Sequence, residues 1–178
     1  THFNLPTDIA VLSDGSFYVS DGYANSRVIK FSPAGKFLFQ WGTKGAGPGQ
    51  FDLPHAITTD ANGNVYVADR SNARVQVFDA KGEFLSEWKN SKLGRPYSVA
   101  IGKTGDAFVV DGGDQPESPP DRSRAFRLSL GGNIEKTFGS FGNYDGQFRL
   151  AHDIAVASDG SVYVVDAWGM RVQKFVLQ

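Results

Sequence analysis

The sequence contains no cysteine and only one methionine. Without cysteine the chain cannot form disulfides or thiolate metal sites, although the cellular compartment stays undecided. Long hydrophobic runs are also missing: no stretch could span a bilayer, and we expect no secretory signal peptide at the start of the chain. We therefore expect no membrane-embedded function.

An excess of charge of one sign is absent as well. Eighteen Lys and Arg residues face nineteen Asp and Glu residues, and the formal net charge is −1. Nucleic-acid-binding domains gather basic side chains on one face, and anionic membrane surfaces attract similar clusters. Here the basic residues are scattered singly, so we expect neither a nucleic-acid nor a membrane partner.

What the chain does contain is a fourfold repeat. Each copy has an apolar strand, a turn containing Gly, a second strand that ends on Asp, and a third strand that follows Arg. The closing aspartates recur after 48, 42 and 55 residues, and they are Asp21, Asp69, Asp111 and Asp166. This is the period of four-stranded propeller blades. The predicted fold is an all-β propeller domain over residues 1–178, with blades at about 3–50, 51–94, 95–147 and 148–178.

The strands are expected at recurring places in each copy, joined by hairpin turns in which Gly or Asn takes a positive φ. First strands are expected at Asp8–Leu12, Ala56–Asp60, Ser98–Gly102 and Asp153–Ala157. Second strands are expected at Phe17–Asp21, Val65–Asp69, Ala107–Asp111 and Val162–Asp166. Third strands are expected at Arg27–Ser32, Arg74–Asp79, Arg124–Ser129 and Arg171–Val176. Fourth strands are expected near Phe37–Gly42, Phe84–Trp88 and Ile134–Phe138.

The repeat departs from regularity in three places. The last copy ends before a fourth strand, which predicts an arc of a larger propeller or an arc that pairs with a second copy. Thr43–Gln50 is expected to be a flexible crossover between blades. The Pro-rich insert Gly112–Ser123 is expected to be a surface loop at one rim.

One slot at the start of the first strands carries candidate metal chemistry. The slot holds Thr7, His55, Tyr97 and His152 in the four copies. Because first strands line the channel of a propeller, these side chains are expected to face a common axis. Two converging imidazoles suggest a divalent metal with open coordination positions. Alternatively, each His fills a hydrogen-bonding position in the channel wall.

The segments that follow the closing aspartates differ between copies and supply two further candidates. Tyr23 offers a phenol that can accept a proton, and Arg70 offers a forked donor suited to a carboxylate. Alternatively, Tyr23 packs on a neighbouring blade and Arg70 pairs with an acidic residue. The closing aspartates themselves recur in every copy, so we assign them to the scaffold, bonded to the following turn beside the recurrent Arg.

The stretches Asp21–Val28, Phe31–Phe37 and Gln40–Gly42 resemble more than a generic NHL-repeat propeller. Together with Pro48–Phe51, Pro54–His55, Ala68–Arg70, His152–Gly160 and Val162–Tyr163, they resemble peptidyl-α-hydroxyglycine α-amidating lyase, the second catalytic half of the peptide-amidating enzymes. The similarity covers nearly the whole chain. It is weakest in the third copy.

That resemblance implies a six-bladed propeller in which three channel histidines hold zinc, and a reaction that yields peptide amide and glyoxylate. It implies that His55 and His152 are two of the zinc ligands and that Tyr23 is the base on the α-hydroxyl. Arg70 would lie near the substrate carboxylate, and Asp153 would lie beside a structural calcium. The third His and another arginine would belong to blades before the first residue, and a secreted or periplasmic location is favoured. The other hypothesis is a non-catalytic NHL scaffold that binds a protein or peptide.

Overall fold

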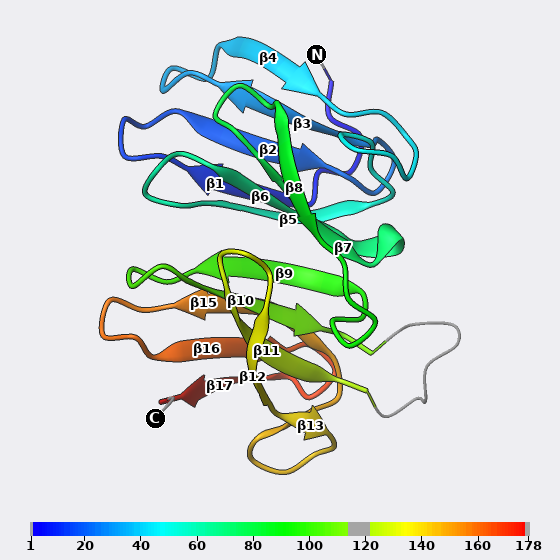
Figure 1. Cartoon of the computed structure of the whole chain (residues 1–178), viewed down its shortest axis with the longest axis vertical. Coiled ribbons are helices and arrows are strands. Elements are labelled where there is room, and N and C mark those ends of the chain that lie inside the picture. Colours follow the sequence, from blue (N-terminus) through cyan, green and yellow to red (C-terminus); the bar gives the residue numbers. More distant parts are fainter. Residues whose placement is uncertain (1, 114–121, 177–178) are drawn as a thin grey trace. The chain divides into compact units, whose positions relative to one another are not determined.

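The computed structural model describes residues 2–113 and 122–176 (Figure 1). The described residues form β-strands and one short 3-10 turn, η1 (Arg70–Asn72), so the predicted all-β fold is confirmed. No helix among them is long and apolar enough to cross a membrane. The chain divides into two compact units, Thr1–Glu87 and Trp88–Gln178. The central part of the predicted rim loop, residues 114–121, lies outside the described residues.

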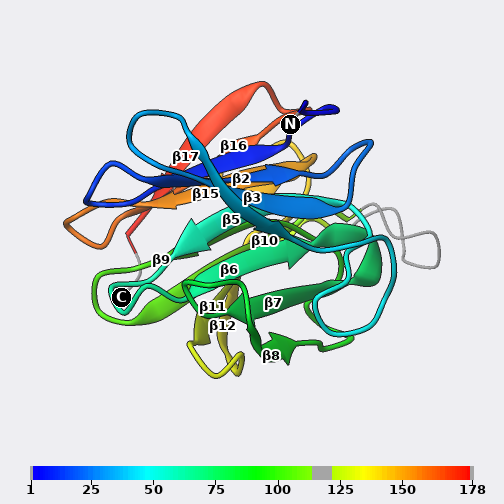
Figure 2. The ribbon, with the colours of Figure 1, turned by 90° about the horizontal axis from the view of Figure 1, so that it is seen from above.

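The first unit contains two blades, each a four-stranded antiparallel sheet in chain order. Blade one consists of β1 (Asp8–Val11), β2 (Phe17–Asp21), β3 (Arg27–Phe31) and β4 (Phe37–Trp41). Blade two consists of β5 (Pro54–Thr59), β6 (Val65–Asp69), β7 (Arg74–Phe78) and β8 (Phe84–Trp88), and Figure 2 shows these strands side by side. Within this unit the first strands β1 and β5 are neighbours, as the channel-lining slot requires.

The second unit also contains two blades. Blade three consists of β9 (Pro96–Ile101), β10 (Asp106–Asp111), β11 (Arg124–Ser129) and β12 (Ile134–Phe138). Blade four is the three-stranded sheet β15 (Ala151–Val156), β16 (Val162–Asp166) and β17 (Arg171–Phe175). Between the two blades runs a short parallel pair, β13 (Ser140–Phe141) and β14 (Gln147–Phe148), which the repeat did not predict. The first strands β9 and β15 are again neighbours.

The hairpin turns follow the predicted chemistry. Gly15 and Gly160 each have a φ of 81°, which lies in the left-handed region that favours glycine. In each turn the glycine N–H donates to the carbonyl three residues earlier, Leu12 O and Ala157 O respectively. These turns fix the register of the first two strands, and with it which strand residues face each neighbouring blade.

Within each unit the core lies between the two sheets. In the first unit, Val28 on β3 and Ile57 on β5 belong to one buried cluster, which also contains Tyr18, Val65 and Phe78. In the second unit, Phe108 and Ile154 belong to an equivalent cluster. The inner strands of one blade therefore pack against the first strand of the next blade in the same unit: β2 neighbours β5, and β10 neighbours β15.

The closing aspartates are buried scaffold groups, as the repeat predicted. All four are fully buried, and each accepts hydrogen bonds from the turn that follows it or from an arginine. Asp21 Oδ2, for example, accepts from Asn25 Nδ2 at 2.7 Å and from Arg27 Nε at 3.0 Å. A buried carboxylate needs such partners because desolvation penalises its charge.

Blade three departs from the predicted pairing. The repeat places Arg124 in the arginine slot, but the side chain that donates to Asp111 Oδ2 is Arg122, whose Nε lies 2.9 Å away. Arg122 also donates to the carbonyls of Ser91 and Lys92. Arg124 is instead the backbone register partner of Asp111 on β11. The insert in this copy places an arginine, Arg122, two residues before the repeat position of Arg124. The buried Asp111 carboxylate accepts from Arg122 because that side chain reaches it.

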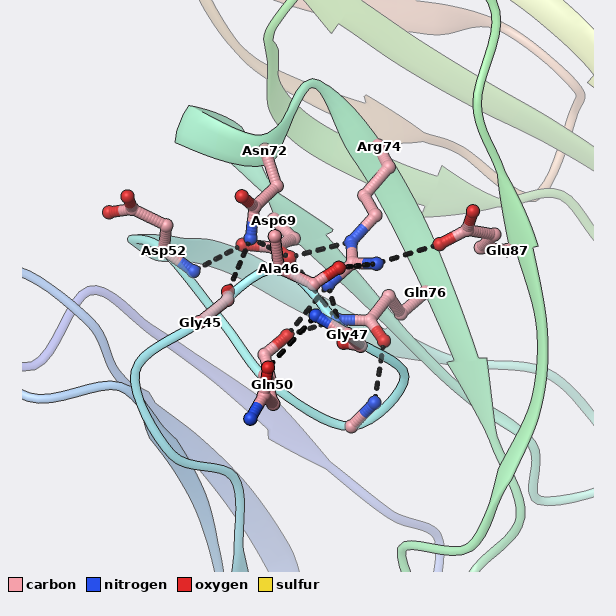
Figure 3. Close-up of polar contacts among 11 residues, drawn as sticks. Gly45, Ala46, Gly47, Gln50, Asp52, Asp69, Asn72, Arg74, Gln76 and Glu87 are labelled. Atoms are coloured by element: carbon pink, nitrogen blue, oxygen red, sulfur yellow. Dashed lines mark hydrogen bonds and ion pairs between the residues drawn. The ribbon is translucent and has the colours of Figure 1, made fainter.

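The predicted flexible crossover Thr43–Gln50 is held by Arg74, as Figure 3 shows. The guanidinium is 2% exposed and donates to Asp69 Oδ2, to Glu87 Oε2, and to three carbonyl oxygens of the crossover. Those three carbonyls belong to Ala46, Gly47 and Gln50. The five guanidinium N–H groups therefore all have acceptors. Burial raises the pKa of the Asp69 carboxyl, while the Asn72 and Arg74 hydrogen bonds act in the opposite direction.

The second unit repeats this arrangement. Arg171 donates to the carbonyls of Asn143, Tyr144 and Gln147 in the segment before blade four. In both units a glutamine two residues after the arginine completes the set: Gln76 Nε2 donates to Gln50 O, and Gln173 Nε2 donates to Gln147 O. The crossover Thr43–Gln50 is therefore bonded to blade two, because backbone carbonyls inside the segment are the acceptors of a buried arginine.

Candidate functional site

Two of the sequence-predicted site residues meet in the first unit. The Tyr23 hydroxyl and His55 Nε2 are hydrogen-bonded at 3.1 Å, and their rings meet edge to face with centroids 5.7 Å apart. His55 is 6% exposed, whereas Tyr23 is half exposed. The pair therefore joins a buried imidazole to a phenol that solvent and a ligand can reach. Of the alternatives that the sequence left open for Tyr23, packing on the neighbouring blade and a reactive position are both compatible with this contact.

The local sequence explains how the pair forms. A Cβ on Gly22 would lie 2.0 Å from Pro54 O, so only glycine allows the turn of blade one to approach the start of β5 this closely. Thr7 Oγ1 donates to the same Pro54 carbonyl at 2.7 Å. Thr7, which occupies the repeat slot of His55 in blade one, thus fixes the residue directly before His55. Sequence reasoning identified the slot and missed this positioning role, for which the only signal was the departure from His.

Arg70 enters the same region from blade two. It begins the turn η1, and its backbone N–H donates to Leu53 O at 3.1 Å. The turn ends at Ala73, which has a φ of 53°, so the chain reverses within four residues and returns to β7. The backbone of the half-buried Arg70 is therefore bonded to Leu53, which lies two residues before His55 in the sequence. The structure brings its backbone to the predicted site, and the carboxylate-binding role stays a prediction.

A polar cleft of about 620 Å³ opens beside Tyr23. It is lined by Gly22–Arg27, by Gly42–Lys44, and by Asp52 and Leu53. Lys44 and Asp52 form an exposed ion pair on its wall. A volume of this size falls within the range of small-ligand sites.

The other predicted metal residues lie in the second unit. The ring of His152 meets Tyr97, its equivalent in blade three, edge to face with centroids 5.3 Å apart. Asp153 Oδ1 accepts hydrogen bonds from Ser98 Oγ at 2.7 Å and from the Ile154 N–H at 2.8 Å. Within this unit Asp153 therefore ties the first strand of blade four to that of blade three.

The described residues contain no group of three or more His, Cys, Asp or Glu side chains that could hold a metal ion. A catalytic zinc is usually held by three protein ligands. His55 supplies one imidazole nitrogen beside a phenol, which suits zinc chemically, but it does not form a complete ligand set. The prediction that His55 and His152 share a zinc remains a prediction, as do the roles of Tyr23, Arg70 and Asp153.

The NHL repeat family matches residues 3–31, 51–78 and 148–175, which correspond to blades one, two and four. The chain is 40% identical over 185 residues to peptidyl-glycine alpha-amidating monooxygenase B of Xenopus laevis. It is 35% identical over 193 residues to peptidyl-alpha-hydroxyglycine alpha-amidating lyase 1 of Drosophila melanogaster. Each alignment covers 98% of this chain, so the resemblance to the lyase is confirmed.

The chain spans only part of these relatives, 20% of the Xenopus protein and 35% of the Drosophila protein. A third relative, NHL repeat-containing protein 3 of Homo sapiens, is 43% identical over 112 residues, which are 61% of this chain and 32% of that protein. Among solved structures, the WD40 β-propeller domain of Doa1 superimposes with a TM-score of 0.69 at 13% identity. That match covers 100% of this chain and 53% of the other, and it supports the propeller fold alone.

Proposed function

We propose that this chain, an NHL-repeat propeller that resembles the amidating lyases, is the lyase-type part of a protein that cleaves peptidyl-α-hydroxyglycine to peptide amide and glyoxylate. The observation that carries the proposal is the 3.1 Å contact between the Tyr23 hydroxyl and His55 Nε2. It joins the two residues that the resemblance names as proton acceptor and metal ligand. The sequence similarity along nearly the whole chain supports the same reading.

In this proposal Tyr23 acts as the phenolate and takes the proton of the substrate α-hydroxyl. The C–N bond then breaks, its electron pair leaves with the amide nitrogen, and the hydroxyl oxygen forms the aldehyde carbonyl of glyoxylate. Tyr23 returns the proton to the amide nitrogen, so the products are one peptide amide and one glyoxylate. A half-exposed side chain suits this task because its oxygen must reach the substrate.

Arg70 is proposed to bind the substrate carboxylate through its forked guanidinium, which fixes the orientation of the reacting carbon. The polar cleft beside Tyr23 has room for part of the preceding peptide. Its walls include the oppositely charged side chains of Lys44 and Asp52 and the turn at Gly22–Arg27. This mixed lining favours contacts with the peptide backbone, which every peptide substrate shares.

The proposed metal is zinc, bound by His55 and His152 in the assembled protein; when bound, it would polarise the α-hydroxyl or the carboxylate as a Lewis acid. His55 is held for this role by Thr7 and Pro54, which fix its backbone, and by Tyr23 at its Nε2. Asp153 is proposed to lie beside a structural calcium, since calcium prefers carboxylate oxygens.

The alternative is a non-catalytic NHL propeller that binds a protein or peptide. The observation that favours it is the 43% identity to NHL repeat-containing protein 3, over 61% of the chain. In that case the Tyr23–His55 contact is a packing interaction between blades, and the polar cleft beside it is a peptide-binding surface without chemistry.

Metal content and product formation separate the two functions. The functional protein that contains this chain is incubated with a peptidyl-α-hydroxyglycine, and its zinc is measured by plasma mass spectrometry. Bound zinc with peptide amide and glyoxylate in equal amounts is the result that we expect. A metal-free protein that binds the peptide and releases no glyoxylate would overturn the lyase and leave the scaffold. The isolated chain is expected to release little or no glyoxylate, because only two zinc ligands are proposed within it.

A further inference from the structure

His55 is an extra residue in the strand ladder of blade two. The β5–β6 ladder shifts its register between Pro54 and Ala56, and it thereby skips His55. The β15–β16 ladder skips His152 in the same way. Bulges of this kind redirect a side chain and are frequent beside active sites. The ladder alone therefore does not set the direction of the His55 imidazole.

Two consecutive residues of β1 bind β5 on both sides of His55. Thr7 Oγ1 donates to Pro54 O at 2.7 Å, and Asp8 Oδ2 accepts from the Ile57 N–H at 2.9 Å. Among the four described strands of blade two, β5 lies at the edge of the sheet, so its outer side has no strand partner there. The two contacts hold the residue before His55 and the residue two positions after it. The bulged segment is thus bonded to blade one at both ends.

The Asp8 contact has a counterpart that blades one and four form within themselves. In each of these blades an Asp follows the repeat slot and accepts from the N–H of the Ile that comes next. The oxygen–nitrogen distance is 2.7 Å from Asp8 Oδ1 to Ile9 and 2.8 Å from Asp153 Oδ1 to Ile154. In both blades the backbone just beyond the slot is fixed by a carboxylate of the same blade.

Blade two lacks this carboxylate, because the residue that follows His55 is Ala56. The N–H of Ile57, which corresponds to that of Ile9, donates instead to Asp8 Oδ2 of blade one. One carboxylate thus serves two blades through its two oxygens. The backbone beside His55 therefore depends on a side chain of the neighbouring blade.

The strand that supplies these contacts is itself fixed. The Thr7 N–H donates to Ser20 O at 2.9 Å, and the Thr7 hydroxyl lies 2.8 Å from Ser20 Oγ. Ser20 belongs to β2 and is fully buried. Asp8 is half-buried, and a hydrogen bond from an N–H to its carboxylate is charge-assisted and stronger than a neutral one. Blade one can therefore hold the bulge of β5 firmly.

We propose that Asp8 is a positioning residue for His55. Its carboxylate holds the Ile57 N–H in place of the aspartate that blade two lacks. Together with Thr7 it fixes the bulge that presents the imidazole to Tyr23, and the 3.1 Å hydrogen bond between the two side chains depends on that direction. The consequence for zinc binding rests on the proposed function, whereas the orientation of the imidazole does not.

Proton–nitrogen correlation spectra of the imidazole rings test the orientation directly. The chain has three histidines, so the signals of His2, His55 and His152 can be resolved and assigned. In Asp8→Ala the Nε2 signal of His55 should shift toward that of the exposed His2, because the hydrogen bond from Tyr23 is weakened. The signals of His2 and His152 should stay in place, which separates a local change from general loosening of the fold.

The matched control is Asp14→Ala. Asp14 Oδ1 accepts from the Ser16 N–H at 2.9 Å in the turn between β1 and β2, so the control removes a carboxylate contact of the same blade at the other end of β1. It should leave the His55 signal unchanged. Circular dichroism and thermal unfolding establish that each variant is folded. Should Asp8→Ala fail to fold, Asp8→Asn has one carbonyl oxygen for two N–H groups, and it should shift the His55 signal in the same direction.

Zinc affinity of the functional protein that contains this chain provides a second measurement. Groups that orient a metal ligand typically contribute about 10–100-fold in affinity, so Asp8→Ala should raise the zinc dissociation constant about tenfold and Asp14→Ala should not. A parental protein that binds no zinc would overturn the proposed lyase, and the imidazole spectra would still decide the role of Asp8. That role is overturned by a folded Asp8 variant with the parental His55 signal, or by an equal shift in Asp14→Ala.

Discussion

Tyr23 Oη lies 3.1 Å from His55 Nε2, although the two residues belong to different blades and are 32 positions apart in the sequence. The Pro54 carbonyl packs against Gly22, which has no Cβ to block it, and accepts a hydrogen bond from Thr7. These contacts fix the backbone beside Tyr23 and the backbone beside His55. Most of our functional predictions depend on this pair.

Replacing Tyr23 with Phe should abolish glyoxylate release by the functional protein while metal stays bound. The hydroxyl is the proposed proton acceptor, and general acid–base groups typically contribute on the order of 10²–10⁴-fold in rate. The ring itself can be kept by Phe, so packing on His55 is preserved. Glyoxylate formation is measured in parallel with metal content. A variant that turns over at the parental rate removes Tyr23 from the chemistry.

His55→Ala should lower the zinc content of the functional protein, and His152→Ala should do the same, because each is proposed to donate one imidazole nitrogen. His2 is the remaining histidine of the chain and is exposed, so His2→Ala is the matched control and should retain the parental zinc content. Plasma mass spectrometry of the dialysed proteins provides the measurement. Unchanged zinc in His55→Ala and His152→Ala would mean that the two imidazoles do not form a site.

Arg70→Lys should raise KM for the hydroxyglycine substrate with little change in kcat. Lysine keeps the charge but replaces a fork with a single point donor, so one charge-assisted hydrogen bond to the carboxylate is lost. A loss of ~1.5 kcal/mol corresponds to an increase of about tenfold in KM. Steady-state kinetics separate the two constants. A fall in kcat at unchanged KM would argue against carboxylate binding by Arg70.

Arg74→Met should reduce the free energy of unfolding by about 3–5 kcal/mol, since it removes the positive partner of the buried Asp69 carboxylate and a donor to three crossover carbonyls. The control is Lys44→Met, which removes one member of an exposed ion pair and should cost less than about 1 kcal/mol. Urea denaturation followed by circular dichroism measures both. Equal losses in the two variants would show that the arginine contacts contribute little.

Arg122→Met should destabilise the chain more than Arg124→Met, by about 2 kcal/mol, because Arg122 and not Arg124 donates to the buried Asp111. The comparison is made by urea denaturation of the two single variants. A larger loss for Arg124→Met would restore the arginine assignment that the repeat predicts.

The sequence alone determined the blade architecture. Strand alternation, the hairpin glycines and the recurrent aspartates are local signals. Because each signal occurs in four copies, an ambiguous pattern in one copy can be assigned by comparison with the other three. The strands of blades one to four fall close to the predicted ranges for this reason. The buried role of Asp21, Asp69, Asp111 and Asp166 could likewise be predicted, because a position shared by all copies serves the scaffold.

The tertiary structure decided which side chains meet across blades. Three contacts depend on how one sheet lies against the next. They are the Tyr23–His55 hydrogen bond, the Thr7 hydrogen bond to Pro54 O, and the hydrogen bonds from Arg74 to the crossover. Sequence spacing does not specify that arrangement, since contacts between blades are set by side-chain packing at the junction. The same reason explains the arginine of blade three: a buried carboxylate selects the donor that reaches it in space, and Arg122 reaches Asp111 although Arg124 holds the repeat position.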